Sequence, residues 1–134
     1  MTRLVVHQSS IAGLKIVERK PVCDERGAFS RLFCADELLD ESWNRAIAQI
    51  NHSVTATTGT IRGMHYQIAP YAEMKLVTCI AGAVHDVAID LRRDSPTFLA
   101  HHSETLSADN CRALLIPPGF IFIRSHMCQT QSAA

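Results

Sequence analysis

The sequence lacks the features that direct a chain to a nucleic acid or into a membrane. Its 13 basic and 13 acidic residues cancel, and no block of basic residues occurs. The longest apolar runs are far too short to cross a bilayer, and no signal-like apolar segment stands at the N-terminus. We therefore expect a cytoplasmic chain with no nucleic-acid or membrane partner, in which any anionic ligand is held by a local cluster of charges.

The sequence also has little that points to redox or nucleophilic chemistry. Its five cysteines leave one unpaired in any intramolecular scheme and show no CxxC spacing, which favours reduced thiols. It contains no glycine-rich phosphate loop, no paired-carboxylate motif and no Ser-His-Asp order. These absences leave the histidines and the basic side chains as the main candidates for chemistry.

Short extended segments dominate what is present. With 134 residues and 47% apolar content, the chain suits one domain with a continuous core. Alternating or apolar stretches, separated by turn signals, predict strands at 14–18, 28–33, 53–60, 60–67, 75–81, 83–91, 98–106 and 111–116. The only helical pattern, over 34–48, predicts a short surface helix. This arrangement indicates an antiparallel sandwich or barrel, and a jelly roll is its most economical form.

Charged and titratable side chains gather in residues 59–67 (GTIRGMHYQ) and 73–76 (EMKL), which we predict to lie on two neighbouring strands. Successive side chains of a strand point to opposite faces, so Arg62 and His65 would diverge in a regular strand. Gly63 lies between them and permits a bend or bulge at little steric cost. We therefore expect a distortion at Gly63 that brings Arg62 and His65 together.

Several ordered strings carry a family resemblance: CDERGAFSRLF, QINHS, RGMHYQ, EMKLV, GAVHDVAIDLR, SPT and IPPGF. Together they closely resemble the dTDP-4-dehydrorhamnose 3,5-epimerases, the RmlC-like cupins of deoxysugar biosynthesis, from about residue 16 to about residue 120. The resemblance implies an all-β fold, a double-stranded β-helix (jelly roll) with one short helix, as a single cupin-type domain over 1–134. It implies epimerisation at C3 and C5 of dTDP-4-dehydro-6-deoxyglucose, on the route to dTDP-rhamnose for lipopolysaccharide or O-antigen, with no cofactor.

The resemblance also assigns roles to individual residues. His65 matches the base, which would remove a proton next to the C4 ketone, and an imidazole with an ordinary pKa of roughly 6.5 suits that step. Lys75 matches the group that stabilises the enolate oxygen. Arg62 matches the arginine on the nucleotide diphosphate, and Gln49 and Asn51 match polar substrate contacts. The alternative for His65 is a buried, hydrogen-bonded structural histidine.

Two residues near the N-terminus point to a dimer. Arg26 matches an arginine that dimers of the family donate across their interface by strand exchange, and Phe29 matches its aromatic companion. The resemblance thus implies a homodimer formed by N-terminal strand exchange around a dTDP-4-keto-6-deoxyhexose. The alternative for Arg26 is an ordinary solvated turn residue.

The sequence does not offer the metal ligands of many cupins, which use a His-x-His pair, a later Glu and a His beyond a Pro-x-Gly turn. Here Gln67 stands two positions after His65, and Phe122 stands three positions after Gly119. Only His65 and Glu73 remain, whereas a stable transition-metal site needs three or four ligands. We therefore expect no metal.

The chain departs from the family pattern after Phe120. A typical relative continues with Ala-His-Gly-Phe, whereas this sequence reads IFIRSH over 121–126. Phe122 then replaces a substrate-binding histidine, and the donor tyrosine and the acid that orients the base would lie beyond Ala134. We expect a domain that is incomplete at its C-terminus, with a divergent tail over 121–134. The alternatives are a catalytically impaired sugar-nucleotide-binding relative and a nonfunctional truncated product.

Overall fold

The computed structural model describes residues 2–41, 43–68 and 72–128, and these are almost entirely β. The strands are β1 Leu4–Gln8, β2 Lys15–Arg19, β3 Val22–Asp24, β4 Gly27–Phe29, β5 Ile61–His65, β6 Lys75–Thr78, β7 Ala83–Asp90, β8 His101–Ser107, β9 Arg112–Ile116 and β10 Phe120–Cys128. One short helix, α1 (Ala35–Leu38), continues into a 3-10 turn, Leu39–Glu41.

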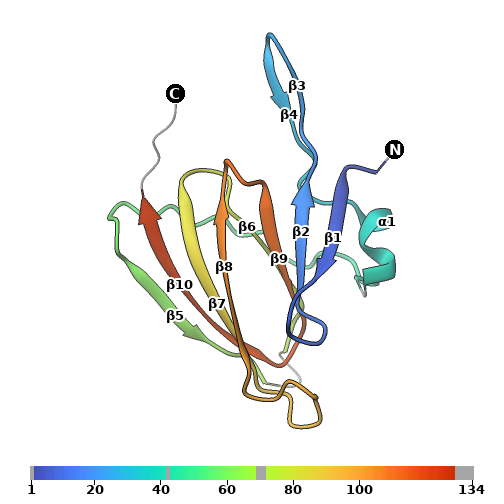
Figure 1. Cartoon of the computed structure of the whole chain (residues 1–134), viewed down its shortest axis with the longest axis vertical. Coiled ribbons are helices and arrows are strands. Elements are labelled where there is room, and N and C mark those ends of the chain that lie inside the picture. The colour runs from blue at the N-terminus through green and yellow to red at the C-terminus, as the bar shows by residue number, and fades with distance from the viewer. Residues whose placement is uncertain (1, 42, 69–71, 129–134) are drawn as a thin grey trace.

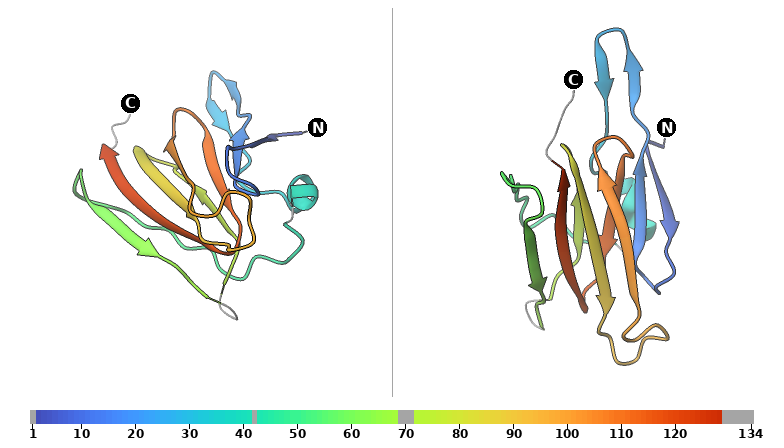
Figure 2. Two further views of the ribbon diagram at one scale, coloured as in Figure 1. Left: turned by 60° about the horizontal axis from the view of Figure 1, so that its bottom comes forward. Right: turned by 60° about the vertical axis from the view of Figure 1, so that its left-hand side comes forward.

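Two four-stranded antiparallel sheets pack face to face (Figures 1 and 2), with strand orders β1-β2-β9-β6 and β5-β10-β7-β8. The core between them contains Leu114 and Ile116 from β9, and Val84, Ala88 and Phe122 from the other sheet. Removing this apolar surface from water is the main force that holds the sheets together. The predicted all-β cupin sandwich with one short helix is confirmed.

The first sheet buries its second face as well. Residues of β9 alternate, so that Ala113 and Leu115 point away from the other sheet and pack with Leu38 of α1. The helix is much shorter than the predicted 34–48, because only Leu38 finds a buried place and Leu39 is 56% exposed. A helix that buries a single side chain against the sheet needs no more than one or two turns.

The predicted strand boundaries were wrong at the N-terminus and in the middle of the chain. The first strand is β1, ahead of the predicted 14–18, and 28–33 is extended only as far as Phe29. There β4 pairs with β3 in an exposed hairpin that projects from the body of the molecule (Figure 1). Residues 53–60 form a loop with a turn at its end, where the hydroxyl of Thr60 donates to the carbonyl oxygen of Thr57.

Two carboxylates of β7 lie in the interior of the molecule. Asp86 and Asp90 alternate with Val87 and Ile89, and both aspartates are 0% exposed. The apolar and polar residues at even positions all face inward. Each buried carboxylate forms an ion pair with an arginine, Asp86 with Arg124 and Asp90 with Arg92, which offsets the cost of burying its charge. The inward face of β7 therefore carries these two carboxylates together with Val84 and Ala88.

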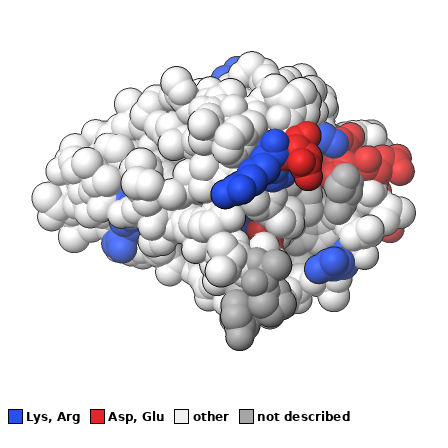
Figure 3. Space-filling model, turned by 90° about the horizontal axis from the view of Figure 1, so that it is seen from below, with Lys and Arg blue, Asp and Glu red and all other residues white. Residues whose placement is uncertain are grey.

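The segment predicted to be a divergent tail forms β10, the longest strand of the described chain. It lies inside its sheet, between β5 and β7, and bonds to both. The end of the molecule seen in Figure 3 carries few charged side chains, with Lys and Arg scattered or next to Asp and Glu. No helix in the described part of the chain is long and apolar enough to span a membrane.

Candidate active site

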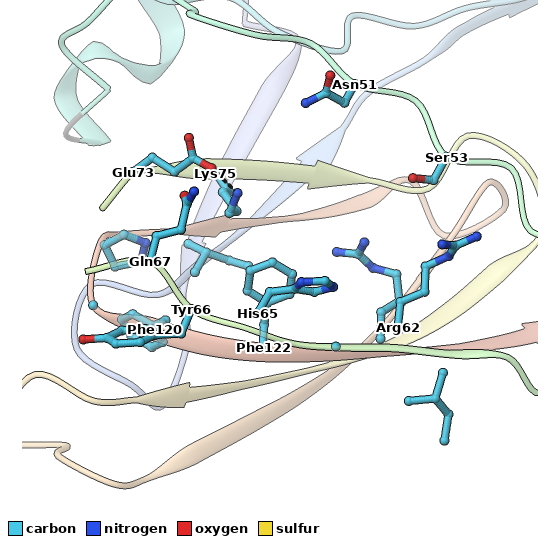
Figure 4. A pocket seen from close by; sticks show the side chains of 16 residues that line it. Asn51, Ser53, Arg62, His65, Tyr66, Gln67, Glu73, Lys75, Phe120 and Phe122 are labelled. Carbon is cyan, nitrogen blue, oxygen red and sulfur yellow. Dashed lines mark hydrogen bonds and ion pairs between the residues drawn. The ribbon is translucent and has the colours of Figure 1, made fainter. Parts of the chain in front are cut away.

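A pocket of about 680 Å³ opens between the two sheets (Figure 4). Its size suits a small organic ligand. Strands from both sheets and the loop before β5 contribute its walls: Asn51, Ser53, Ile61, Arg62, Gly63, His65, Tyr66, Gln67, Glu73, Lys75, Ile116, Pro117, Gly119, Phe120, Phe122 and Arg124.

A bulge in β5 places Arg62 and His65 on the same wall. Across the β5–β10 pair, His65 lies opposite Phe122 and Arg62 lies opposite Arg124, with a register shift between them. Three positions of β5 therefore span two positions of β10, which cancels the alternation that would separate the two side chains. Gly63 supplies the required backbone with a φ of +131°. The expectation that this glycine brings Arg62 and His65 together is confirmed.

One phenyl ring stands against both candidate catalytic residues. The ring centroids of Phe122 and His65 are 5.3 Å apart, and Lys75 Nζ lies 5.7 Å from the centroid of the Phe122 ring. A cation at that distance over a ring is attracted to its face. Phe122 is 7% exposed, so it gives His65 and Lys75 a shared apolar floor.

Lys75 comes from the opposite sheet. The prediction that β5 and β6 are neighbours was wrong, because β5 pairs with β10 and β6 pairs with β9. Lys75 reaches the pocket across the sandwich, and its ammonium donates a hydrogen bond to Glu73 (Figure 4). Glu73, two residues before Lys75, thus orients the ammonium on the wall of the pocket.

A second group of charges lies at the other end, where Arg62 points toward Ser53 in Figure 4. Arg62 Nε donates to Thr55 Oγ1 at 3.1 Å, and Arg124 donates to Asp86 Oδ2 at 3.2 Å. Burial raises the pKa of Asp86, while Arg124 opposes that rise. His126 Nε2 lies 3.0 Å from Thr55 Oγ1, and its pKa is lowered by burial and then by Arg62 and Arg124.

The remaining predicted residues are distributed unevenly. Asn51 lines the pocket, and its amide donates to Gln49 Oε1 at 3.3 Å, whereas Gln49 is not among the lining residues. Arg26 and Phe29 lie on the β3–β4 hairpin outside the pocket. Arg26 pairs there with Asp24, and Phe29 is 69% exposed. Within one chain the hairpin and the pocket are separate.

Sequence reasoning gave no binding role to several lining residues: Ser53, Tyr66, Gln67, Glu73, Phe120 and Arg124. Tyr66 and Glu73 belong to the same motifs as His65 and Lys75, and this could have indicated a place in the pocket. The sequence around Arg124 matches no motif, so it gave no such indication. In the described ranges no three His, Cys, Asp or Glu side chains gather as ligands for a metal ion.

Comparisons with known proteins agree on one family. The model of the dTDP-4-dehydrorhamnose 3,5-epimerase family matches residues 8–132, which include β10. The chain is 44% identical over 117 residues to the dTDP-4-dehydrorhamnose 3,5-epimerase of Shigella flexneri, covering 86% of this chain and 64% of the relative. It is 39% identical over 119 residues to the Salmonella typhimurium enzyme of that name, covering 87% and 64%.

Solved structures show the same fold. The epimerase of Bacillus anthracis, solved with TDP and PPi bound, superposes with a TM-score of 0.89 at 36% identity, covering 95% of this chain and 73% of that one. The Legionella pneumophila RmlC, solved with dTDP-4-keto-L-rhamnose, gives 0.87 at 35% identity, covering 94% and 66%. The chain spans 57% to 64% of the length of the first curated relatives that it matches.

Proposed function

Because the chain belongs to the dTDP-4-dehydrorhamnose 3,5-epimerase family, we propose that it binds a dTDP-linked 4-keto-6-deoxyhexose and epimerises it at C3 and C5. The observation that carries the proposal is the convergence of His65, Lys75 and Arg62 on one pocket, from strands of both sheets. Relatives solved with TDP and PPi or with dTDP-4-keto-L-rhamnose support this class of ligand.

In the proposed reaction His65 is the base. Its imidazole accepts the proton from C3 or C5, and the electrons of the broken C–H bond move to the C4 oxygen to give an enolate. The Lys75 ammonium, held by Glu73, lies where it can stabilise that negative oxygen. A proton delivered to the opposite face of the carbon then completes the inversion. The apolar Phe122 ring strengthens these charge interactions, because it keeps water away from one side.

The nucleotide end of the ligand is proposed to lie at the opposite end of the pocket. Arg62 there offers a permanently charged fork that suits phosphate oxygens. Asn51 and Ser53 from the loop before β5 supply polar groups on the same side (Figure 4). Gln49 contributes through its hydrogen bond with Asn51. This arrangement sets the reacting sugar beside His65.

We also propose a homodimer in which the β3–β4 hairpin of one chain reaches the pocket of the other. All six strand residues of the hairpin are exposed, and none of them belongs to a core cluster of the described residues. Arg26 and Phe29 would then complete a neighbouring site. The proposed compartment is the cytoplasm, which suits reduced thiols such as those of Cys23, Cys34 and Cys111.

Hydrogen exchange tests the proposed chemistry directly. The chain is incubated in D₂O with dTDP-4-dehydro-6-deoxyglucose, and deuterium at C3 and C5 is followed by NMR. We expect exchange that His65→Asn abolishes and that the matched control His101→Asn, at an exposed position of β8, leaves intact. Exchange undiminished in His65→Asn would remove His65 as the base.

Exchange without net inversion would have a separate meaning. It would favour a relative that binds and deprotonates the sugar without returning the proton to the other face. The Phe122 ring beside His65 favours such an impaired relative, because a phenyl group cannot make the substrate contact of the histidine that the family resemblance implies at this position. Product analysis by NMR of the sugar ring couplings separates the two outcomes.

A further inference from the structure

Arg124 stands directly across from Arg62. The two residues are register partners of the β5–β10 pair, and both side chains line the pocket. Because partners directly opposite in an antiparallel pair extend to the same face, the two guanidinium groups share one wall. Figure 4 shows that Arg62 lies at the end of this wall away from Lys75 and Glu73, with His65 between them.

The wall carries more positive than negative charge. Asp86, buried behind it at 0% exposure, pairs with Arg124 at 3.2 Å. In the described residues Arg62 has no ion pair and bonds through Nε to the neutral hydroxyl of Thr55. Burial is the main cause of the lowered pKa of His126, and both arginines add to it because they disfavour its proton. Two guanidinium groups face one carboxylate, so the wall has one uncompensated positive charge that an anion can neutralise.

The Asp86 contact also orients Arg124. It engages one terminal nitrogen, while Nε is buried with no hydrogen-bond partner in the described part of the chain. The group also lies 5.7 Å from the centroid of the Phe122 ring, which limits its rotation. A guanidinium fixed in this way loses little entropy when it binds a ligand, and it presents a fork that matches phosphate oxygens.

We propose that Arg62 and Arg124 together bind the two phosphates of a nucleoside diphosphate, with Asp86 as the residue that positions Arg124. The inference rests on the proposed function for the identity of the ligand. The two guanidinium groups by themselves indicate only that the ligand is a compact anion with two phosphate groups. Arg124 is therefore a binding residue from the segment that sequence reasoning treated as a tail.

The test measures affinity for inorganic pyrophosphate, dTDP and thymidine by calorimetry. Arg124→Gln should lower the affinity for pyrophosphate and for dTDP by about 10-fold or more, as expected for a lost charge-assisted hydrogen bond. The affinity for thymidine should not change. Arg93→Gln removes the same charge from an exposed turn outside the pocket and should have no such effect.

Arg124→Gln leaves the buried Asp86 without its cation, and this alone could unfold the chain. A second variant covers that case. The double change Asp86→Asn with Arg124→Gln removes both charges of the buried pair, and it should fold and still lose pyrophosphate binding. Circular dichroism checks the fold of each variant. Affinity within about twofold of the parent in this double variant, or no binding of pyrophosphate and dTDP by the parent chain, would overturn the proposed pair.

The two proposals fail in different ways. If pyrophosphate binding depends on Arg62 and Arg124 but dTDP binds no tighter and no exchange occurs at the sugar, the arginine pair stands and the proposed function falls. If Arg62→Gln weakens dTDP while the Arg124 variants do not, Arg124 is excluded from the site and the proposed function is untouched.

Discussion

Gly63 lies against the backbone of Phe122 in the neighbouring strand. A Cβ atom at position 63 would stand 2.9 Å from the carbonyl oxygen of Phe122 and 3.1 Å from the Cα of Ile123. Its φ of +131° is also one that side chains rarely adopt. The bulge that turns Arg62 and His65 to one wall therefore depends on a residue without a side chain.

We expect Gly63→Ala to lower the free energy of unfolding by at least about 1–3 kcal/mol, the usual cost of a strained backbone. It should also weaken dTDP binding, because β5 must move away from β10. Urea denaturation and calorimetry measure the two effects.

Gly59→Ala is the matched control for this change. Gly59 also has a positive φ, +88°, yet no atom lies within 4 Å of its added Cβ. This variant has the backbone strain but no clash with a neighbouring strand, so its affinity for dTDP should stay closer to that of the parent chain. Equal losses in both variants would show that the contact with Phe122 does not matter.

His126 should titrate below its ordinary pKa of 6.5, because burial and then Arg62 and Arg124 disfavour its charged form. The unfolded chain then takes up this proton first, so the contribution of His126 to stability falls as the pH drops below 6.5. NMR of the imidazole protons gives the value, which Arg62→Gln should raise. A pKa at or above 6.5 in the parent chain would contradict this account of the charges.

Mixed dimers test the hairpin. In the proposed exchange each pocket combines the body of one chain with Arg26 of the other. Chains with Arg62→Ala and chains with Arg26→Ala should each bind dTDP weakly. After the two are unfolded and refolded together, random pairing should restore about a quarter of the sites to full affinity. Mixtures that bind no better than their components would argue against exchange, and light scattering checks that dimers form.

Much of the fold could be predicted because local pattern and burial agree. The segments that became β6, β7 and β9 show apolar or alternating residues between turn signals, and the structure places strands there within a few residues. Gly63 between Arg62 and His65 was enough to predict a distortion. Both cases depend on short-range chemistry that a sequence displays directly.

The rest depended on long-range pairing. The identity of the buried face of β7 is set by Arg124 and Arg92, since a carboxylate is buried only where a cation meets it. Lys75 approaches His65 across the sandwich instead of along a sheet, which depends on sheet order. Arg124 entered the site through its register with Arg62, a relation that no local pattern records.

The position of β10 has a consequence for the order in which the molecule can form. Strand β5 has β10 as its only partner among the described strands, and β10 comes last of these along the chain. During synthesis on a ribosome β5 therefore leaves the ribosome before the strand with which it pairs. The wall with Arg62 and His65 can form only after β6 to β9 and then β10 have been released, so the pocket is assembled after both of its sheets have begun to form.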